Sequence, residues 1–261
     1  ELLARTHGAL RASKDLGKNR ISSGDAVGIG NGVAEAREML ARGEGLRAVS
    51  QPIVALDGEL EVAREYLARG PRGAFEMPSD FFRICHESDL LTAVDLSCLR
   101  TCLAADDSSS GRAHVNLFPS TLLETRASRL LALFPESRPR NRYVVEISEQ
   151  QILGDPAYLR ESVGALRDAG LRIAVDDVGF GRSSLESLVV LEPDLVKIDR
   201  AYASGISRSA EKERSLRRLV RVAATLGAEI SAEGVESRED LGLLREIGVA
   251  YAQGYVFGRP E

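Results

Sequence analysis

The feature of this sequence that most constrains its fold is a regular alternation of short apolar runs with longer helical patterns. The apolar runs are rich in Val, Ile and Leu, and they occupy residues 46–56, 59–65, 112–118, 142–148, 171–177, 195–199, 228–234 and 250–258. Strands that alternate with helices predict a mostly parallel sheet. Eight such strands in a chain of 261 residues favour a closed barrel over an open sheet.

The connection between the first two runs is much shorter than the others. Only Asp57 and Gly58 separate them. A turn of this length joins antiparallel strands, because parallel strands need a crossover of a dozen or more residues. The sequence therefore predicts an α/β protein, a modified (β/α)8 TIM-type barrel with one antiparallel strand near the N-terminal end.

Two further segments precede the barrel pattern. Residues 1–22 have the spacing of an amphipathic helix with a short tail, and residues 23–33 are rich in Gly and Ser, as linkers are. Gly28 and Gly30 do not complete a dinucleotide-binding motif, because no strand precedes them and the third glycine is missing. We expect a terminal helix over 1–22, a linker over 23–33 and one barrel domain over 34–261.

The apolar runs are too short to cross a membrane. None approaches the roughly 18 consecutive apolar residues of a membrane span, and the first residues do not resemble a signal peptide. We therefore expect a cytoplasmic location for this chain, although a full-length protein could be attached to a membrane through other regions.

Composition narrows the chemistry that the barrel can support. The chain has three Cys and three His, which makes a zinc site or a disulfide framework poorly supported. Its net charge of -5 argues against a broad basic face for a nucleic-acid polymer. Any divalent cation would have to be held by oxygen ligands, and acid–base chemistry would depend on Asp and Glu. His86 and His114 are interpreted as structural, because no partner His completes a site.

Polar residues end nearly every predicted strand. In a barrel of this kind the carboxyl ends of the strands form one mouth, where active sites lie. These residues are Glu65, Asn116, Glu146, Glu149, Asp176, Asp177, Asp199 and Glu233. One such residue alone is usually a solvated cap, but this many carboxylates at one mouth repel one another unless cations hold them. Lys197, within an otherwise apolar strand, either reaches this cluster or marks an exposed face.

An ordered set of motifs resembles the EAL domain, the family of bacterial phosphodiesterases that cleave cyclic di-GMP. The motifs are QPIV (51–54), EYLAR (65–69), HVNL (114–117), VVEISE (144–149), AVDDVGFGRSSL (174–185), LVKID (195–199), SAEGVE (231–236) and AQGYVFGRP (252–260). Residues 9–21 also resemble the closing segment of a GGDEF domain. The resemblance implies a piece of a tandem GGDEF–EAL protein, with an upstream GGDEF domain as partner.

The resemblance implies a role for each matching residue. It implies two Mg²⁺ or Mn²⁺ ions per site, with Ca²⁺ as an inhibitor, and cyclic di-GMP as the ligand that is opened to linear pGpG. The implied metal ligands are Glu65, Asn116, Glu146, Asp176 and Asp177, and the implied catalytic residues are Glu233, Lys197 and Glu149, the last as anchor of the loop after Asp177. The implied substrate-binding residues are Gln51, Leu67, Arg69, Asp199 and Gln253.

The chain also departs from the family pattern. Tyr66 replaces the middle residue of the Glu-Ala-Leu motif, and strand alternation predicts that it points away from the site. Val178, Phe180 and Arg182 change the loop that in the family orders the second metal and forms a homodimer interface. This change keeps open a second reading, a catalytically silent cyclic di-GMP receptor. A third reading is an unrelated metal-dependent barrel enzyme.

Overall fold

The computed structural model describes residues 38, 45–70, 85, 90–107, 111–179 and 182–261. The chain divides into two compact units, which comprise Glu1–Leu46 with Arg69–Val94 and Arg47–Ala68 with Asp95–Glu261. The expected terminal helix over 1–22 and linker over 23–33 lie outside the described residues, as do His86 and Phe180.

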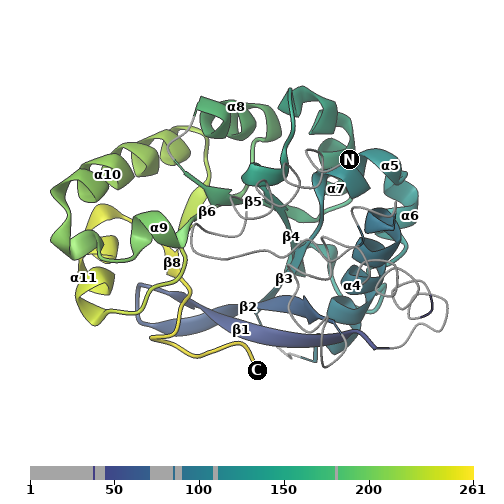
Figure 1. Ribbon diagram of the computed structural model, residues 1–261, viewed down its shortest axis with the longest axis horizontal. Helices are drawn as coiled ribbons and strands as arrows, with labels where there is room; N and C mark the ends of the chain where they lie inside the picture. The colour runs from purple at the N-terminus through teal and green to yellow at the C-terminus, as the bar shows by residue number, and fades with distance from the viewer. Residues whose placement is uncertain (1–37, 39–44, 71–84, 86–89, 108–110, 180–181) are drawn as a thin grey trace, which may run out of the picture. The chain divides into compact units, whose positions relative to one another are not determined.

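Eight strands close into a barrel in the order β1 to β8 (Figure 1). They are β1 (Arg47–Ala55), β2 (Leu60–Arg69), β3 (Arg112–Asn116), β4 (Tyr143–Ser148), β5 (Arg172–Val178), β6 (Leu195–Ile198), β7 (Glu229–Ala232) and β8 (Tyr251–Ala252). Strand β1 runs antiparallel to β8, whereas every neighbouring pair from β2–β3 to β7–β8 is parallel. The predicted barrel with one antiparallel strand is confirmed.

Helices occupy the connections between strands (Figure 1). They are α4 (Leu91–Ala105), α5 (Pro119–Glu124), α6 (Ala127–Leu131), α7 (Arg160–Asp168), α8 (Arg182–Leu191), α9 (Arg200–Ala203), α10 (Ala210–Thr225) and α11 (Arg238–Ile247), with 3-10 turns η1 (Arg140–Arg142), η2 (Glu149–Gln151), η3 (Pro156–Leu159) and η4 (Ile206–Arg208). No helix among the described residues is long and apolar enough to cross a membrane.

The helix ends follow ordinary capping chemistry. The Ser209 hydroxyl accepts from the backbone N–H of Lys212 at the start of α10, and the Ser237 hydroxyl accepts from that of Glu239 at the start of α11. Gly248 ends α11 with a φ of 97°, a left-handed conformation that glycine adopts without strain. These caps satisfy backbone groups that the helices themselves leave unpaired.

The two faces of the strands have different environments. Outward side chains such as Val145, Ile173 and Val196 belong to the large apolar core that the helices cover. Inward side chains form a much thinner apolar layer, in which Val144, Ala174 and Leu195 pack together. The main hydrophobic core therefore lies between barrel and helices, and the barrel interior has room for polar residues on either side of its apolar layer.

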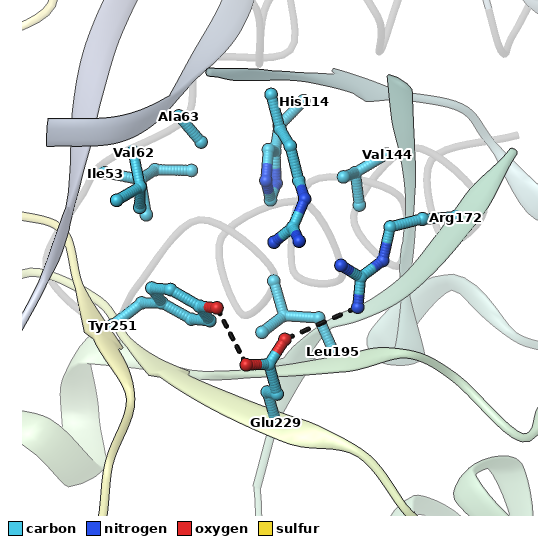
Figure 2. A pocket seen from close by; sticks show the side chains of 10 residues that line it. Ile53, Val62, Ala63, His114, Val144, Arg172, Leu195, Glu229 and Tyr251 are labelled. Carbon is cyan, nitrogen blue, oxygen red and sulfur yellow. Dashed lines mark hydrogen bonds and ion pairs between the residues drawn. The ribbon is translucent and has the colours of Figure 1, made fainter. Parts of the chain in front are cut away.

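One of these polar layers lies at the amino-terminal ends of the strands (Figure 2). The Tyr251 hydroxyl donates to Glu229 Oε1 at 2.7 Å, and Arg172 Nη2 lies 3.4 Å from Glu229 Oε2. Arg172 also lies 3.5 Å from Asp194 Oδ1. The charged groups of this layer thus pair with one another. They do not pair with the carboxylates at the other end of the barrel.

Strand β8 is shorter than the predicted run over 250–258, because the chain turns at Gly254. A Cβ atom at Gly254 would lie 2.1 Å from the backbone oxygen of Val235 and 2.3 Å from its backbone nitrogen. The Val235 N–H donates to the Gln253 carbonyl at 3.0 Å, so the two segments run in close contact. Only glycine permits this approach, and it fixes where Gln253 projects.

Replacing Gly254 by Ala is expected to lower the free energy of unfolding by about 1–3 kcal/mol, because the added Cβ meets backbone that must shift. Gly164→Ala is the matched control. Gly164 lies within α7 with nothing within 4 Å of its would-be Cβ, and alanine is favoured over glycine in a helix by roughly 0.5–1 kcal/mol. Urea unfolding of both variants measures the difference, and equal changes would contradict the close approach at Val235.

Candidate active site

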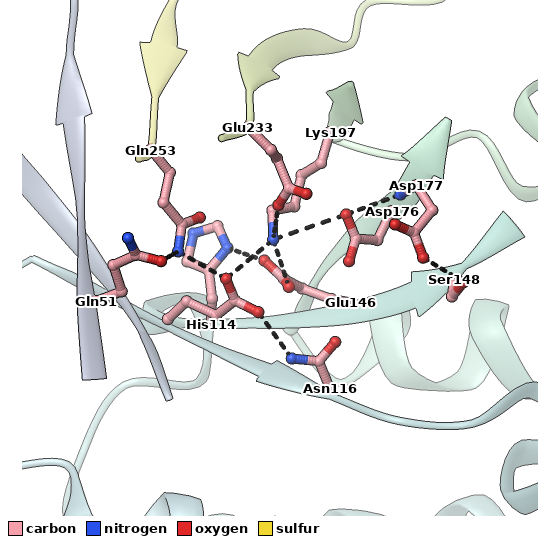
Figure 3. A network of polar contacts seen from close by, with 11 residues as sticks. Gln51, His114, Asn116, Glu146, Ser148, Asp176, Asp177, Lys197, Glu233 and Gln253 are labelled. Carbon is pink, nitrogen blue, oxygen red and sulfur yellow. Dashed lines mark hydrogen bonds and ion pairs between the residues drawn. The ribbon is translucent and has the colours of Figure 1, made fainter. Parts of the chain in front are cut away.

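The polar residues that end the strands meet at the carboxyl-terminal mouth of the barrel (Figure 3). Strand register explains why they meet: Asn116 is paired with Glu146 across β3 and β4, and Ser148 with Asp176 across β4 and β5. The side chains that gather there, from β1 to the residues that follow β7 and β8, are Gln51, Glu65, Asn116, Glu146, Asp176, Asp177, Lys197, Glu233 and Gln253.

Lys197 is the centre of this mouth. Its Nζ lies 2.6 Å from Glu233 Oε1, 2.7 Å from Glu146 Oε2, 3.3 Å from Glu65 Oε2 and 3.7 Å from Asp176 Oδ1. The side chain is fully buried. The sequence left open whether Lys197 reaches the carboxylate cluster or lies on an exposed face. The structure shows that it lies inside the cluster.

The four carboxylates hold the lysine in its charged form. Burial alone would lower the pKa of Lys197, but the charges of Asp176, Glu146, Glu233 and Glu65 outweigh it and raise the pKa well above its usual value. A buried ammonium group is otherwise too costly to keep. Lys197 is therefore a permanent cation at the floor of the mouth.

One lysine cannot neutralise four carboxylates. Burial raises the pKa of Asp176 to about 6 and that of Glu233 to about 8, against the opposing effect of Lys197. Burial and the neighbouring Glu65 raise the pKa of Glu146 well above its usual value. Keeping all four carboxylates ionised at neutral pH is therefore costly for the protein alone, and a bound cation would remove this repulsion.

Glu65 is the carboxylate that stays ionised. Burial would raise its pKa, but Lys197 and hydrogen bonds from Asn116 and Gln253 lower it to about 2. Asn116 Nδ2 donates to Glu65 Oε1 at 2.9 Å, and Gln253 Nε2 donates to Glu65 Oε2 at 2.8 Å. Gln253 Nε2 also lies 3.0 Å from Gln51 Oε1, which links β1 to the site.

The consecutive residues Asp176 and Asp177 both reach the mouth because β5 is irregular there. A regular strand would point them to opposite faces. The pairing of β5 with β6 shifts between Val175 and Val178, and Asp177 has a φ of 56°. The Ser148 hydroxyl then donates to Asp177 Oδ2 at 2.8 Å. Such bulges often re-aim a side chain beside an active site.

The resulting oxygen cluster fits a divalent cation. Asp176, Asp177 and Glu233 each offer a carboxylate oxygen, and these three atoms lie within 4.8 Å of one another. Hard cations such as Mg²⁺ and Mn²⁺ prefer oxygen ligands of this kind. The donor set, with its excess of negative charge, therefore suits the metal ions that the sequence predicts.

A cavity of about 250 Å³ opens above the cluster. Glu65, Asp176 and Glu233 line it, together with Arg200 at the start of α9 and Tyr255 after β8. The guanidinium of Arg259 lies 4.5 Å from the centre of the Tyr255 ring. Arg200 and Tyr255 were not predicted from sequence, because neither ends a strand.

Four predicted site residues are not part of the contacts around Lys197. Glu149 is buried and begins η2, which contacts both β5 and α8. Leu67 lies within β2, and Arg69 is its last residue. Asp199 Oδ1 accepts from the Ala201 N–H at 2.6 Å and so caps α9. Their predicted roles stay predictions.

The structure places three of the residues that depart from the family pattern: Tyr66, Val178 and Arg182. Tyr66 points away from the mouth, as predicted, and its hydroxyl donates to Asp106 Oδ1 at 3.0 Å. Val178 ends β5 and is fully buried in the apolar core. Arg182 is the first residue of α8. Neither Tyr66 nor Val178 replaces a group at the mouth.

His114 is a site neighbour that the sequence did not indicate. Its Nδ1 lies 2.6 Å from Glu146 Oε1, and both side chains are buried. The available signal was strand alternation, because His114 lies two residues before Asn116 and so shares its inward face. The interpretation of His114 as structural rested only on the lack of a partner His.

The comparisons with known proteins agree with this geometry. A family model described as the EAL domain matches residues 33–260. The chain is 31% identical over 233 residues to the probable cyclic di-GMP phosphodiesterase PdeA of Escherichia coli, a match that covers 86% of this chain and 32% of that protein. It is 32% identical over 237 residues to the cyclic di-GMP phosphodiesterase RocR of Pseudomonas aeruginosa, over 87% of this chain and 60% of that protein.

The chain thus spans only part of these relatives. Among solved structures, Klebsiella pneumoniae BlrP1 in its calcium and cyclic di-GMP complex matches with a TM-score of 0.75 at 27% identity, over 84% of this chain and 56% of that one. The manganese and cyclic di-GMP complex of BlrP1 matches with a TM-score of 0.72. Since the family model covers nearly all of its length, the chain belongs to the EAL domain family.

Proposed function

We propose that this chain is a metal-dependent phosphodiesterase that opens cyclic di-GMP to linear pGpG. The observation that carries the proposal is the cluster of Asp176, Asp177 and Glu233 beside the buried Lys197. The names of PdeA and RocR support the substrate, as do the cyclic di-GMP complexes of BlrP1. The finer assignments that follow are part of the same proposal.

Five residues would hold two Mg²⁺ or Mn²⁺ ions: Glu65, Asn116, Glu146, Asp176 and Asp177. Two such ions activate a water and stabilise the charge that develops on the phosphoryl oxygens. Calcium tolerates looser geometry than magnesium, so it is expected to occupy the same oxygens and inhibit.

Glu233 and Lys197 are the groups that would act on the attacking water. Glu233 is the carboxylate whose pKa is raised to about 8 without a metal, with burial as the main cause. It is suited to accept the proton of the water when the oxygen attacks phosphorus. Lys197 is a fixed positive charge 2.6 Å from Glu233 Oε1, and it orients that carboxylate and stabilises its charged form.

The ligand would be held by residues around this cluster. We assign Gln51, Leu67, Arg69, Asp199 and Gln253 to substrate binding. A guanidinium suits a phosphate because it offers two parallel donors, which is the reason for assigning Arg69 to the phosphate. The contacts of Gln253 with Gln51 and Glu65 support the placement of both glutamines beside the ligand.

Glu149 would act through the backbone around Asp177. It is buried at the start of η2, and η2 contacts β5 and α8 on either side of the changed loop. We therefore assign it the anchoring of this loop, not contact with substrate.

Exposed apolar side chains support a homodimer through the same region. Leu185 and Val189 on α8 are each 52% exposed, and Tyr158 on η3, which contacts α8, is 73% exposed. Apolar groups that gather on one exposed surface usually mark a contact with another protein. The partner that we propose is a second copy of this chain.

The setting of the domain is also a proposal. We assign residues 1–22 to the end of an upstream GGDEF domain, residues 23–33 to a linker and residues 34–261 to the EAL domain. The described cysteines, Cys85, Cys98 and Cys102, are buried and form no disulfide, which suits the reducing cytoplasm.

Incubation with cyclic di-GMP and Mn²⁺ is expected to yield pGpG, measured by chromatography. Glu233→Gln should lower kcat by about 100-fold or more, because it removes the proton acceptor. The control is Glu239→Gln, an exposed carboxylate on α11, which should leave kcat unchanged. Tight ligand binding by the native chain without product would instead support the silent receptor, and no binding would leave the unrelated metal-dependent barrel enzyme.

The metal-free protein is expected to lose stability as the pH rises from 5 to 9. Asp176 and Glu233 have folded-state pKa values of about 6 and about 8, above their unfolded values of about 4. The folded state therefore binds more protons in this range, so the stability that is present below pH 4 is lost as the pH rises through 6 and 8. Unfolding in EDTA measures this slope.

Two comparisons check the origin of that slope. Asp176→Asn should make it shallower, because one of the two titrating carboxylates is gone. Excess Mn²⁺ should also reduce it, because the ionised cluster is then neutralised. A stability that rises with pH between 5 and 9 in EDTA would show that the carboxylates are not forced together as the structure indicates.

The native chain is expected to be a dimer when its mass is measured by size-exclusion chromatography with light scattering. The double variant Leu185→Glu, Val189→Glu should be a monomer, because burying two charges in an apolar interface is too costly. Leu60→Glu is the control, since Leu60 is 67% exposed at the start of β2. Dimers that persist in the double variant would rule out this surface.

A further inference from the structure

His114 is the buried group whose contact the proposed mechanism does not use. It lies on β3, and its Nδ1 is 2.6 Å from Glu146 Oε1. The other oxygen of Glu146, Oε2, accepts from Lys197 Nζ at 2.7 Å. Both oxygens of this carboxylate are therefore held, one from each side (Figure 3).

The two contacts of Glu146 are not equivalent. Lys197 contacts four carboxylates, so its position depends on all four and not on Glu146 alone. The imidazole of His114 contacts the Glu146 carboxylate through Nδ1, at 2.6 Å from Oε1. A planar ring with a directed donor fixes the plane of a carboxylate better than a rotating ammonium group does.

The surroundings of His114 keep its ring in place. Val144, Leu195 and Arg112 line the same small cavity as His114, at the apolar layer of the barrel (Figure 2). That cavity holds only about 10 Å³, which is at the lower limit of what one water needs, roughly 10–15 Å³. His114 is itself only 3% exposed, so its ring is closely surrounded by protein.

The imidazole is also in the correct protonation state to donate. Burial lowers its pKa to about 3, and the nearby charges of Lys197, Arg112 and Arg172 act in the same direction. A neutral imidazole carries one N–H. When Glu146 is ionised, as a metal ligand would be, an N–H on Nδ1 would donate to its Oε1.

We propose that His114 is a positioning residue that fixes the Glu146 carboxylate in the orientation from which it ligates a divalent cation, and so sets the affinity of the site for that cation. The inference rests on the proposed function, in which Glu146 is a metal ligand. Outer partners that orient metal ligands typically change metal affinity by about 10–100-fold when they are removed.

The test compares Mn²⁺ affinity, measured by calorimetry on EDTA-stripped protein, among four chains. His114→Ala should weaken Mn²⁺ binding by about 10–100-fold. His114→Asn should stay within a few-fold of the native chain, because the amide nitrogen lies where Nδ1 was. Leu195→Ala is the matched control, since it loses packing in the same cavity without touching Glu146 and should keep the native affinity.

A second readout is made on the native, metal-free protein. The chain has three histidines, so the ¹⁵N spectrum of the native, metal-free protein is simple to assign with His114→Asn. His114 should show one protonated nitrogen, Nδ1, whose proton exchanges slowly with solvent because the ring is buried. A ring proton that exchanges as fast as that of an exposed histidine would overturn the proposal.

The outcomes separate this inference from the proposed function. If the native chain binds Mn²⁺ and cleaves cyclic di-GMP, but His114→Ala binds Mn²⁺ as tightly as the native chain, the positioning role is wrong and the function stands. If Leu195→Ala weakens binding as much as His114→Ala, the effect is packing and the role is also wrong. If the native chain binds no Mn²⁺, the proposed function itself fails.

Discussion

The charge of Lys197 is the constraint on which the mouth of the barrel depends. A fully buried ammonium group is stable only among carboxylates, and Lys197 has four of them within 4 Å. They come from β2, β4, β5 and the residue after β7, so the lysine joins strands from all around the barrel. Closure of the barrel therefore also brings the side chains of the site together. The polar cluster can be buried because the lysine and each carboxylate make the burial of the other less costly.

Local departures from regular backbone then aim the side chains. The bulge in β5 turns Asp177 back toward Asp176, where a regular pleat would have separated them. At Gly254 the chain passes so close to Val235 that no side chain fits, and this contact sets the direction of Gln253. At both Asp177 and Gly254, the backbone beside the mouth departs from regular strand geometry. The regular barrel supplies rigidity, and the irregular positions supply the geometry that a cation requires.

Much of this arrangement could be predicted from the sequence, and the reasons for the rest are physical. Apolar runs that end in carboxylates reveal both the strands and their functional ends, because burial forces apolar residues inward and parallel strands share one mouth. The β5 bulge could not be predicted, since alternation places Asp176 and Asp177 on opposite faces. His114 was interpreted as structural because no partner His completes a site. Its contact with Glu146, on the next strand, depends on the register of β3 against β4, which the sequence does not show. Asp199 caps α9 in the structure, and its role in substrate binding stays a prediction.

Buried charges are compensated differently at the two ends of the barrel interior. At the amino-terminal end, Arg172 meets Glu229 and Asp194, so charges balance within the protein. At the other end, one lysine faces four carboxylates and the balance is incomplete. The apolar layer of Val144, Ala174 and Leu195 separates these ends, so positive charge from below cannot complete the cluster by direct contact. A compensating cation would have access from the open mouth, where the 250 Å³ cavity lies. A net charge of -5 is thus compatible with an anionic ligand, because cations held at the mouth would present a positive face to it.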